Sequence, residues 1–248
     1  MHDPRRLISQ LLRATPTDVI ILNEMDIGMA RSDQQHTTRL LAHMLGMNYA
    51  WGLEFVELTR GNKQEQIAVG QLPNFHGLHG NAFLTRCSIY DPVVFRDPVG
   101  KYFTDERLGL NADGHEKRLG GRMGLFGRIQ VNGRELVIGS THTVRSVGAR
   151  VRAYINGTDA ITAGDQPSTS CSDFGLRSVD RQRNRGRGLF TWPASCKVLG
   201  NIRGDNFCSN LQVSTPDTVA FPCYKRFGLQ VPLSDHAPIT ITLQLRTS

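Results

Sequence analysis

The residues best suited to chemistry are an acid and a histidine near the C-terminus, Asp235 and His236, which directly precede a run that alternates between apolar and polar residues. Such a run predicts a half-buried strand, and a rigid sheet holds polar side chains at its end, where binding and catalytic groups are often found. An imidazole exchanges protons near neutral pH, and a carboxylate can orient it or bind a cation. The pair therefore indicates a catalytic site more strongly than a core position.

Three further polar residues follow apolar runs elsewhere in the chain: Glu24, His142 and Asp165. Acids and histidines at several strand ends suit a hydrated divalent cation and a phosphate ester better than they suit a core. Each residue alone also has an ordinary structural interpretation. Glu24 could be a solvated acid, His142 a histidine satisfied by a backbone carbonyl, and Asp165 a turn residue.

The hydrophobic pattern predicts the elements that would position these residues. We expect helices over residues 4–14, from Ser32 or Asp33 to Leu45, and over 147–155. We expect strands over 19–22, 49–58, 82–85, 93–95, 123–131, 135–140, 160–163 and 240–245, with another strand-like segment after 202–207. Asn132-Gly133 is a strong hairpin signal, residues 60–80 and 97–122 are expected to be long loops, and the strand over 49–58 contains two acids, Glu54 and Glu57. More strands than helices, joined partly by hairpins, indicate an α+β or layered sandwich architecture.

Composition limits the class of protein and its partners. The 248 residues show no linker or repeat, so we expect one domain over 1–248. The net charge of +7 favours a polyanionic partner such as nucleic acid, although arginine-rich loops are often merely solvated. Five cysteines without a C-x-x-C pair argue against structural zinc and leave disulfides or buried free thiols as alternatives. With no apolar membrane span or signal peptide, the sequence predicts a cytoplasmic protein, or a secreted one if an upstream signal is missing.

Taken in order, six short motifs resemble the endonuclease/exonuclease/phosphatase superfamily from about residue 5 to the C-terminus. They are Leu22-Asn23-Glu24, Gly80-Asn81-Ala82, Ser140-Thr141-His142, Gly164-Asp165, Arg203-Gly204-Asp205 and Ser234-Asp235-His236. The last motif is fairly specific, and the order of all six adds to its weight. The resemblance implies a four-layer α/β/β/α sandwich of two packed mixed β-sheets, and metal-assisted cleavage of a phosphate ester at one edge of the sheets.

The resemblance also implies roles for individual residues. His142, Asp165, Asp205 and His236 would be catalytic, with Asp165 activating the attacking water and Asp205 orienting the ring of His236. Glu24 and Asp235 would bind Mg²⁺ or Mn²⁺, because these hard cations prefer oxygen ligands. Asn81 and Gln166 would contact the substrate.

Two positions depart from the family pattern. The chain begins at the first helix, so the family's opening strand and its asparagine have no counterpart, and Pro167 stands where the family has an asparagine. We expect a monomeric metal-dependent phosphodiesterase that cleaves nucleic acid. The alternatives are a phosphoesterase for a lipid or inositol phosphate, and a catalytically degenerate homologue that binds nucleic acid or protein.

Overall fold

A computed structural model describes most of the first two thirds of the chain and shorter parts of the last third. The described residues are 17–61, 63–97, 118–142, 147–165, 170–178, 205–213, 217–218, 223–226, 229–232, 239–240 and 242–245. The predicted helix over 4–14 lies outside them.

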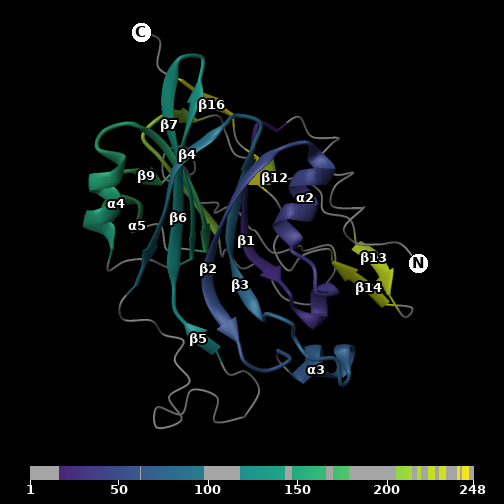
Figure 1. Cartoon of the computed structure of the whole chain (residues 1–248). Coiled ribbons are helices and arrows are strands. Elements are labelled where there is room, and N and C mark those ends of the chain that lie inside the picture. Colours follow the sequence, from purple (N-terminus) through teal and green to yellow (C-terminus); the bar gives the residue numbers. More distant parts are fainter. Residues whose placement is uncertain are drawn as a thin grey trace.

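Two β-sheets form the centre of the molecule (Figure 1). The four-stranded sheet has the order β1 (Val19–Ile27), β3 (Leu78–Thr85), β2 (Asn48–Glu57) and β5 (Arg118–Gly120), and its strands pair antiparallel. The six-stranded sheet has the order β4 (Ile89–Arg96), β6 (Met123–Val131), β7 (Arg134–His142), β8 (Asp159–Asp165), β10 (Asp205–Ser209) and β9 (Arg177–Ser178). This second sheet is mixed, because β7 and β8 run parallel while its other pairs are antiparallel.

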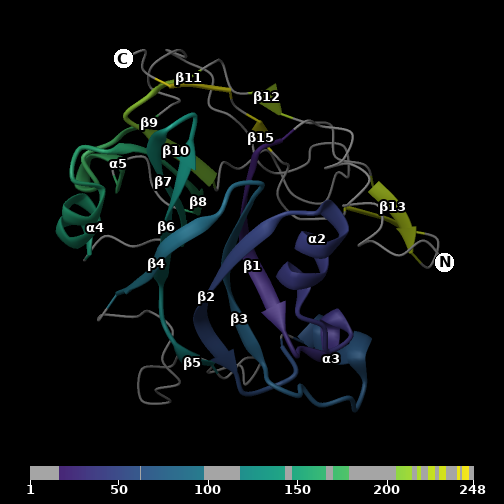
Figure 2. The same ribbon diagram turned by 45° about the horizontal axis from the view of Figure 1, so that its top comes forward.

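Helices cover the outer faces of the two sheets, as Figures 1 and 2 show from two directions. Helix α2 (Thr37–Leu45) packs on β1 and β2, whereas α4 (Gly148–Ile155) and α5 (Ser170–Asp173) lie on the six-stranded sheet. The layers therefore follow the order helix, sheet, sheet, helix. This arrangement confirms the predicted four-layer sandwich.

Alternation along the strands divides the core into three apolar layers. On β3, Phe83 packs between the sheets and the next residue, Leu84, packs beneath α2. On β6, Leu125 faces the layer between the sheets while Phe126 packs under α4 and α5. Because both faces of these strands are buried, apolar residues stand at consecutive positions within each of them, Ala82–Leu84 in β3 and Leu125–Phe126 in β6.

Three short helical or strand segments differ from the sequence expectations. Helix α2 begins at Thr37, with His36 as its N-cap, because a single 3₁₀ turn (Ala30–Ser32) occupies the positions expected to start it. Helix α3 (Lys63–Val69) lies within the predicted loop over 60–80 and consists mainly of good helix formers, and β5 lies within the loop expected over 97–122. The expected end of α2 is confirmed at Gly46, which has φ +64°.

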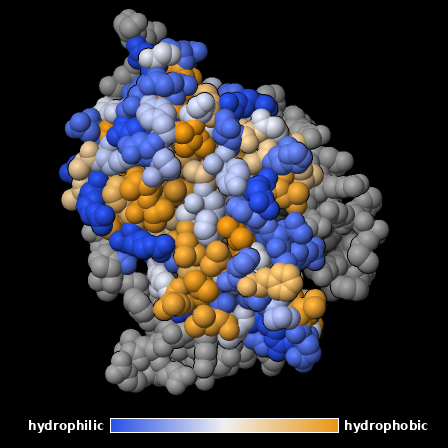
Figure 3. All heavy atoms as spheres, viewed as in Figure 1, coloured by the Kyte–Doolittle hydropathy of each residue, from blue (hydrophilic) through white to orange (hydrophobic). Residues whose placement is uncertain are grey.

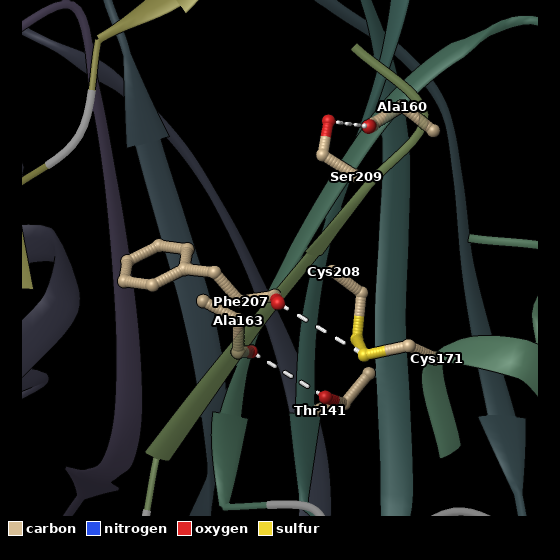
Figure 4. The surroundings of a disulfide bond; sticks show 7 residues. All are labelled: Thr141, Ala160, Ala163, Cys171, Phe207, Cys208 and Ser209. Atoms are coloured by element: carbon tan, nitrogen blue, oxygen red, sulfur yellow. Dashed lines mark hydrogen bonds between the residues drawn. A yellow bond between two sulfur atoms is a disulfide. The ribbon is translucent and has the colours of Figure 1, made fainter. Parts of the chain in front are cut away.

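A disulfide joins α5 to β10 through Cys171 and Cys208 (Figure 4). The Cys208 and Phe207 side chains point to opposite sides of β10, so that Phe207 packs between the sheets while Cys208 joins the outer apolar layer. Cys87 is a free thiol. The bond therefore attaches the outer helical layer to the strand that carries Asp205.

The rest of the described chain forms three two-stranded pairs. These are β11 (Gln212–Val213) with β16 (Leu243–Gln244), β12 (Asp217–Thr218) with β15 (Ile239–Thr240), and β13 (Cys223–Arg226) with β14 (Leu229–Pro232). None of the helices in the described part of the chain is long and apolar enough to cross a membrane.

Candidate active site

Three predicted catalytic residues lie side by side at one end of the six-stranded sheet. His142 pairs with Asp165 in the parallel β7–β8 register, and Asp165 pairs with Asp205 in the β8–β10 register. His142 is almost fully buried, at 6 % exposure. The structure describes the backbones of the two aspartates but not their side chains, so it brings together three strand positions and one oriented imidazole.

A β-bulge on β1 presents Glu24 beside Asn81. The β1–β3 register shifts between Leu22 and Met25, so that two residues of β1, Asn23 and Glu24, lie opposite Asn81. Glu24 adopts φ +59°, its side chain is exposed, and its backbone N–H donates to Asn81 Oδ1 at 3.4 Å. A bulge turns a side chain out of the regular alternation, and here it turns a carboxylate outward.

The same bulge is attached to the second sheet. The Ser140 hydroxyl lies 2.9 Å from both the Leu22 carbonyl oxygen and Asn23 Oδ1 and donates to this pair. A Cβ atom at Gly164 would come within 2.9 Å of Asn23 Nδ2, which shows how closely β8 approaches the bulge. The Glu24 bulge therefore lies next to the ends of β7 and β8.

Glu54 on β2 holds the ring of His142. Its Oε2 atom lies 2.7 Å from His142 Nδ1, and its Oε1 atom lies 3.4 Å from Arg122 Nη1. The Glu54 side chain has no exposed surface. Glu54 is the extra residue of a second bulge, because the β2–β3 register shifts between Leu53 and Phe55.

The surroundings of Glu54 keep it ionised. Burial alone would raise the pKa of its carboxyl group, but the hydrogen bond with His142 and the charges of His142 and Arg122 lower the pKa below its usual value. A carboxylate accepts a hydrogen bond, so the His142 tautomer that fits this geometry carries its proton on Nδ1. Any proton exchanged with a substrate is then exchanged at Nε2.

A second buried acid–histidine pair lies at the end of the four-stranded sheet. Asp26 Oδ1 lies 2.7 Å from His79 Nδ1, and both Asp26 oxygens accept hydrogen bonds from Arg31 at 2.8 Å. Burial opposes ionisation of Asp26, yet the hydrogen bonds from Arg31 and His79 lower its pKa to about 2. The His79 ring stacks on Phe55 at 4.6 Å, so this cluster anchors the strand ends beside Glu54.

His79 lies in β3 and not in the loop expected from the sequence.

Glu24 offers the donor chemistry of a hard divalent cation. Its carboxylate is exposed, forms no ion pair among the described residues, and lies on a backbone fixed by the bulge. Within the same described ranges, no group of three or more His, Cys, Asp or Glu side chains could hold a metal by itself. A cation at Glu24 would therefore need further ligands, and Asp235 is the one predicted from the sequence.

Three predicted site residues, Gln166, Asp235 and His236, lie outside the described residues, as does Pro167. Sequence reasoning did not assign a role to Glu54, although an acid in an otherwise apolar stretch of a strand was a signal for it.

Solved structures share this architecture. No sequence-family profile matches the chain, and no curated protein matches its sequence. A mannosyl-6-phosphatase from Bacteroides thetaiotaomicron is 13% identical with a TM-score of 0.61, and the match covers 98% of this chain and 91% of that one. An endonuclease/exonuclease/phosphatase family protein from Leptotrichia buccalis is 13% identical with a TM-score of 0.60, over 98% and 93% of the two chains.

The chain has the endonuclease/exonuclease/phosphatase fold. A third structure with this fold, D. rerio TDP2 complexed with a single-strand DNA product, is 14% identical with a TM-score of 0.54, and the match covers 96% of this chain and 91% of that one. The fold implied by the six motifs is thus confirmed.

Proposed function

We propose that this protein is a divalent-cation-dependent phosphoester hydrolase that acts on nucleic-acid phosphodiesters. One arrangement carries the proposal. His142 is held by an ionised, buried Glu54, pairs in register with Asp165, and lies beside the bulge that exposes Glu24. A fixed imidazole, a strand-end acid and an exposed carboxylate are the groups that phosphoester hydrolysis requires.

His142 would act on the phosphate through Nε2. It would hydrogen-bond a non-bridging oxygen or protonate the leaving oxygen, while the hydrogen bond with Glu54 keeps the ring in its orientation. Asp165 would orient and activate the attacking water. Asp205, in register with Asp165, would orient His236 against the phosphate.

The residues predicted from the sequence motifs to bind the cation and the substrate keep these roles in the proposal. Glu24 and Asp235 would hold Mg²⁺ or Mn²⁺, which would supply positive charge to the phosphate and the leaving oxygen. Asn81 and Gln166 would bind the substrate phosphate. Asn81 is fully buried and hydrogen-bonds the Glu24 backbone, which places it next to the bulge.

Nucleic acid is the leading substrate because the protein carries a net positive charge that favours a polyanion. The chain carries 29 basic and 22 acidic residues, and Arg150, Arg152 and Arg177 are exposed. A surface that contacts several phosphates releases counterions, so its affinity should fall steeply as salt is added. A structure that shares the fold has a single-strand DNA product bound.

A lipid phosphoester is the second candidate because of an apolar surface around β5 and the end of β2, the strand that carries Glu54. Leu58 follows β2 four residues after Glu54, and Leu119 on β5 pairs with Val56; the two leucines are 57% and 58% exposed. Ile67, Leu72 and Phe75 near α3 are 62–75% exposed. Figure 3 shows hydrophobic surface around β5, at the bottom of the view.

A substrate panel tests these proposals. Purified protein would be assayed with Mg²⁺, Mn²⁺ or EDTA on plasmid DNA, single-stranded DNA, RNA, inositol phosphates and phospholipid vesicles. His142→Gln and Asp165→Asn should each reduce the rate by about 10²-fold or more, because each removes a group that acts at the phosphate. His43→Gln is the matched control, since His43 is exposed on α2.

The outcomes separate the candidates. Release of nucleotides that stops with EDTA and with both site variants supports the nuclease. Turnover of lipid or inositol phosphates with inert nucleic acid replaces the nuclease by the second candidate. No turnover of any phosphoester, together with salt-sensitive binding of nucleic acid, would identify a degenerate homologue and defeat the proposed hydrolase.

A further inference from the structure

Asn81 is a buried amide on the face of β3 that looks toward the six-stranded sheet. Phe83, two residues later on the same face, packs in the apolar layer between the sheets, whereas Leu84 packs beneath α2. Asn81 has no exposed surface. A buried amide that forms no hydrogen bonds is strongly unfavourable, so its partners indicate what the residue does.

The side-chain oxygen of Asn81 accepts a hydrogen bond from the bulge that carries Glu24. In the β1–β3 ladder, Leu22 pairs with Ala82 and Met25 with Gly80, so Asn23 and Glu24 have no pair of their own. The Glu24 N–H donates instead to Asn81 Oδ1 at 3.4 Å. The side chain of Asn81 thus replaces a backbone hydrogen bond that the ladder omits.

Glu24 needs such support because of its backbone conformation. Its φ of +59° lies in the left-handed region, which residues with a Cβ atom rarely occupy without a compensating interaction. Ser140 holds the preceding residue, Asn23, from the other sheet. Of the described side chains, Asn81 is the one that hydrogen-bonds the backbone of Glu24 itself.

The side-chain nitrogen of Asn81, unlike its oxygen, has no hydrogen-bond partner among the described residues. This atom, Nδ2, is buried. The planar carboxamide places Nδ2 next to the oxygen that binds Glu24, so an acceptor for Nδ2 would lie close to the bulge.

We propose that Asn81 is a positioning residue that sets the geometry of Glu24 and thereby the affinity of the protein for its divalent cation. This inference rests on the proposed function, since it takes Glu24 as a metal ligand. Groups that orient a metal ligand typically change metal affinity by about 10- to 100-fold when they are removed. Asn81 does so through the Glu24 backbone, without touching the cation.

Two variants separate the oxygen of Asn81 from its nitrogen. Asn81→Leu keeps the approximate volume and removes both polar atoms, while Asn81→Asp keeps an acceptor for the Glu24 N–H and removes the Nδ2 donor. Thr85→Val is the matched control. Thr85 lies on the same face of β3, is also fully buried, and also accepts a hydrogen bond from a backbone N–H, that of Cys87.

The measurements are amide hydrogen exchange at Glu24 and Mn²⁺ binding by calorimetry. We expect Asn81→Leu to speed exchange at the Glu24 amide by about fivefold or more and to weaken Mn²⁺ binding by about 10- to 100-fold. Asn81→Asp should restore protection of that amide and most of the affinity, and Thr85→Val should change neither. If Asn81 acts through Glu24, the exchange protection of the Glu24 amide and the affinity for Mn²⁺ should fall together. If Asn81 only fills space in the core, both quantities should stay at wild-type values in folded Asn81→Leu protein.

The inference is overturned if folded Asn81→Leu protein keeps wild-type exchange at Glu24 and wild-type Mn²⁺ affinity. If Asn81→Leu does not fold, loss of Glu24 protection in Asn81→Asp overturns it instead. Wild-type protein that binds no Mn²⁺ would refute the proposed metal dependence, and with it the role of Asn81 in metal affinity. Faster exchange at Glu24 together with unchanged Mn²⁺ affinity would likewise overturn the inference while leaving the proposed hydrolase intact.

Discussion

His142 and Glu54 are 88 positions apart in the chain, yet their side chains meet at 2.7 Å between the two sheets. The carboxylate of Glu54 is fully buried, and its hydrogen bond with Nδ1 fixes which ring nitrogen of His142 is left to face the substrate. Sequence reasoning named His142 but not the acid that orients it. The pair therefore adds a residue to the proposed site.

Replacing Glu54 by Gln should slow the reaction without removing the side chain. Glutamine retains an oxygen that can accept from His142 Nδ1 but loses the charge, so we expect kcat to fall by about 10²-fold or more. Glu57→Gln is the control, because Glu57 lies on the same strand, has a fully buried side chain, and pairs with Arg118 at 3.1 Å. Equal losses of kcat in the two variants would argue against a special role for Glu54.

Asp26 should make stability depend on pH in acid. Its pKa is lowered from 3.8 to about 2 in the folded protein, so the folded state favours the ionised form. The stabilisation, about 2 kcal/mol, is complete above pH ~4 and is lost as the pH falls through about 2. Denaturant titrations between pH 2 and 7 should show this loss in the wild type and not in Asp26→Asn.

The control for that experiment is Asp18→Asn, since Asp18 is exposed. A stability curve of Asp26→Asn that keeps the wild-type slope between pH 4 and pH 2 would show that other groups cause the acid sensitivity.

Gly164 should tolerate no side chain. A Cβ atom there would overlap the Thr141 carbonyl oxygen and come within 2.9 Å of Asn23 Nδ2, and its φ is +141°. Gly157 also has a positive φ, +77°, but nothing lies within 4 Å of its Cβ position. We expect Gly157→Ala to cost about 1–2 kcal/mol from backbone strain alone, and Gly164→Ala to cost about 3 kcal/mol or more because overpacking adds to that strain.

Thermal and denaturant unfolding of the two glycine variants would measure this difference. Equal destabilisation would mean that β8 can move away from the Glu24 bulge, in which case the close approach of the two sheets is not needed for folding.

The Cys171–Cys208 disulfide should contribute about 3–4 kcal/mol to stability. The two cysteines are 37 positions apart, and their side chains are buried between α5 and β10. Replacing both by Ser should lower the free energy of unfolding by about that amount and make it insensitive to reducing agent. Cys87→Ser, at a free thiol, should have little effect.

The bond also bears on the compartment in which the protein folds, because disulfides form and persist in oxidising environments. Peptide mapping of protein purified without reductant should recover the Cys171–Cys208 linkage. Recovery of both residues as free thiols would favour the cytoplasmic prediction.

Local patterns were sufficient for most of the fold. The apolar runs that became β1, β6, β7 and β8, the Asn132-Gly133 hairpin and the glycine that ends α2 are all short-range signals, and the structure confirms them. The segments that differ, α3, β5 and the start of α2, are short or capped by an unusual residue, His36. Such segments depend on tertiary packing more than on their own sequence.

The two bulges of the four-stranded sheet could not be predicted from the apolar and polar pattern of the sequence. An alternating pattern assumes that each residue points to the opposite side from its neighbours, and a bulge breaks this rule by one residue. Glu24 and Glu54 each lie at such a break. One carboxylate is turned outward and the other is turned inward to His142, a difference that only the pairing of β1 and β2 with β3 determines.

The fold class and the positions of Glu24, His142 and Asp165 after apolar runs could be predicted from the chain alone, because apolar periodicity and short motifs are local properties. Asn81 and Asp205 were predicted from the resemblance. In the structure Glu24 and Asn81 lie within β1 and β3 and not at strand ends. The packed structure was needed to show that Glu54 holds His142, that Asn81 hydrogen-bonds the Glu24 backbone, and that Asp26 is ionised beside His79. These contacts join strands far apart in the chain, and their energies depend on burial and charge that exist only once the two sheets have packed together.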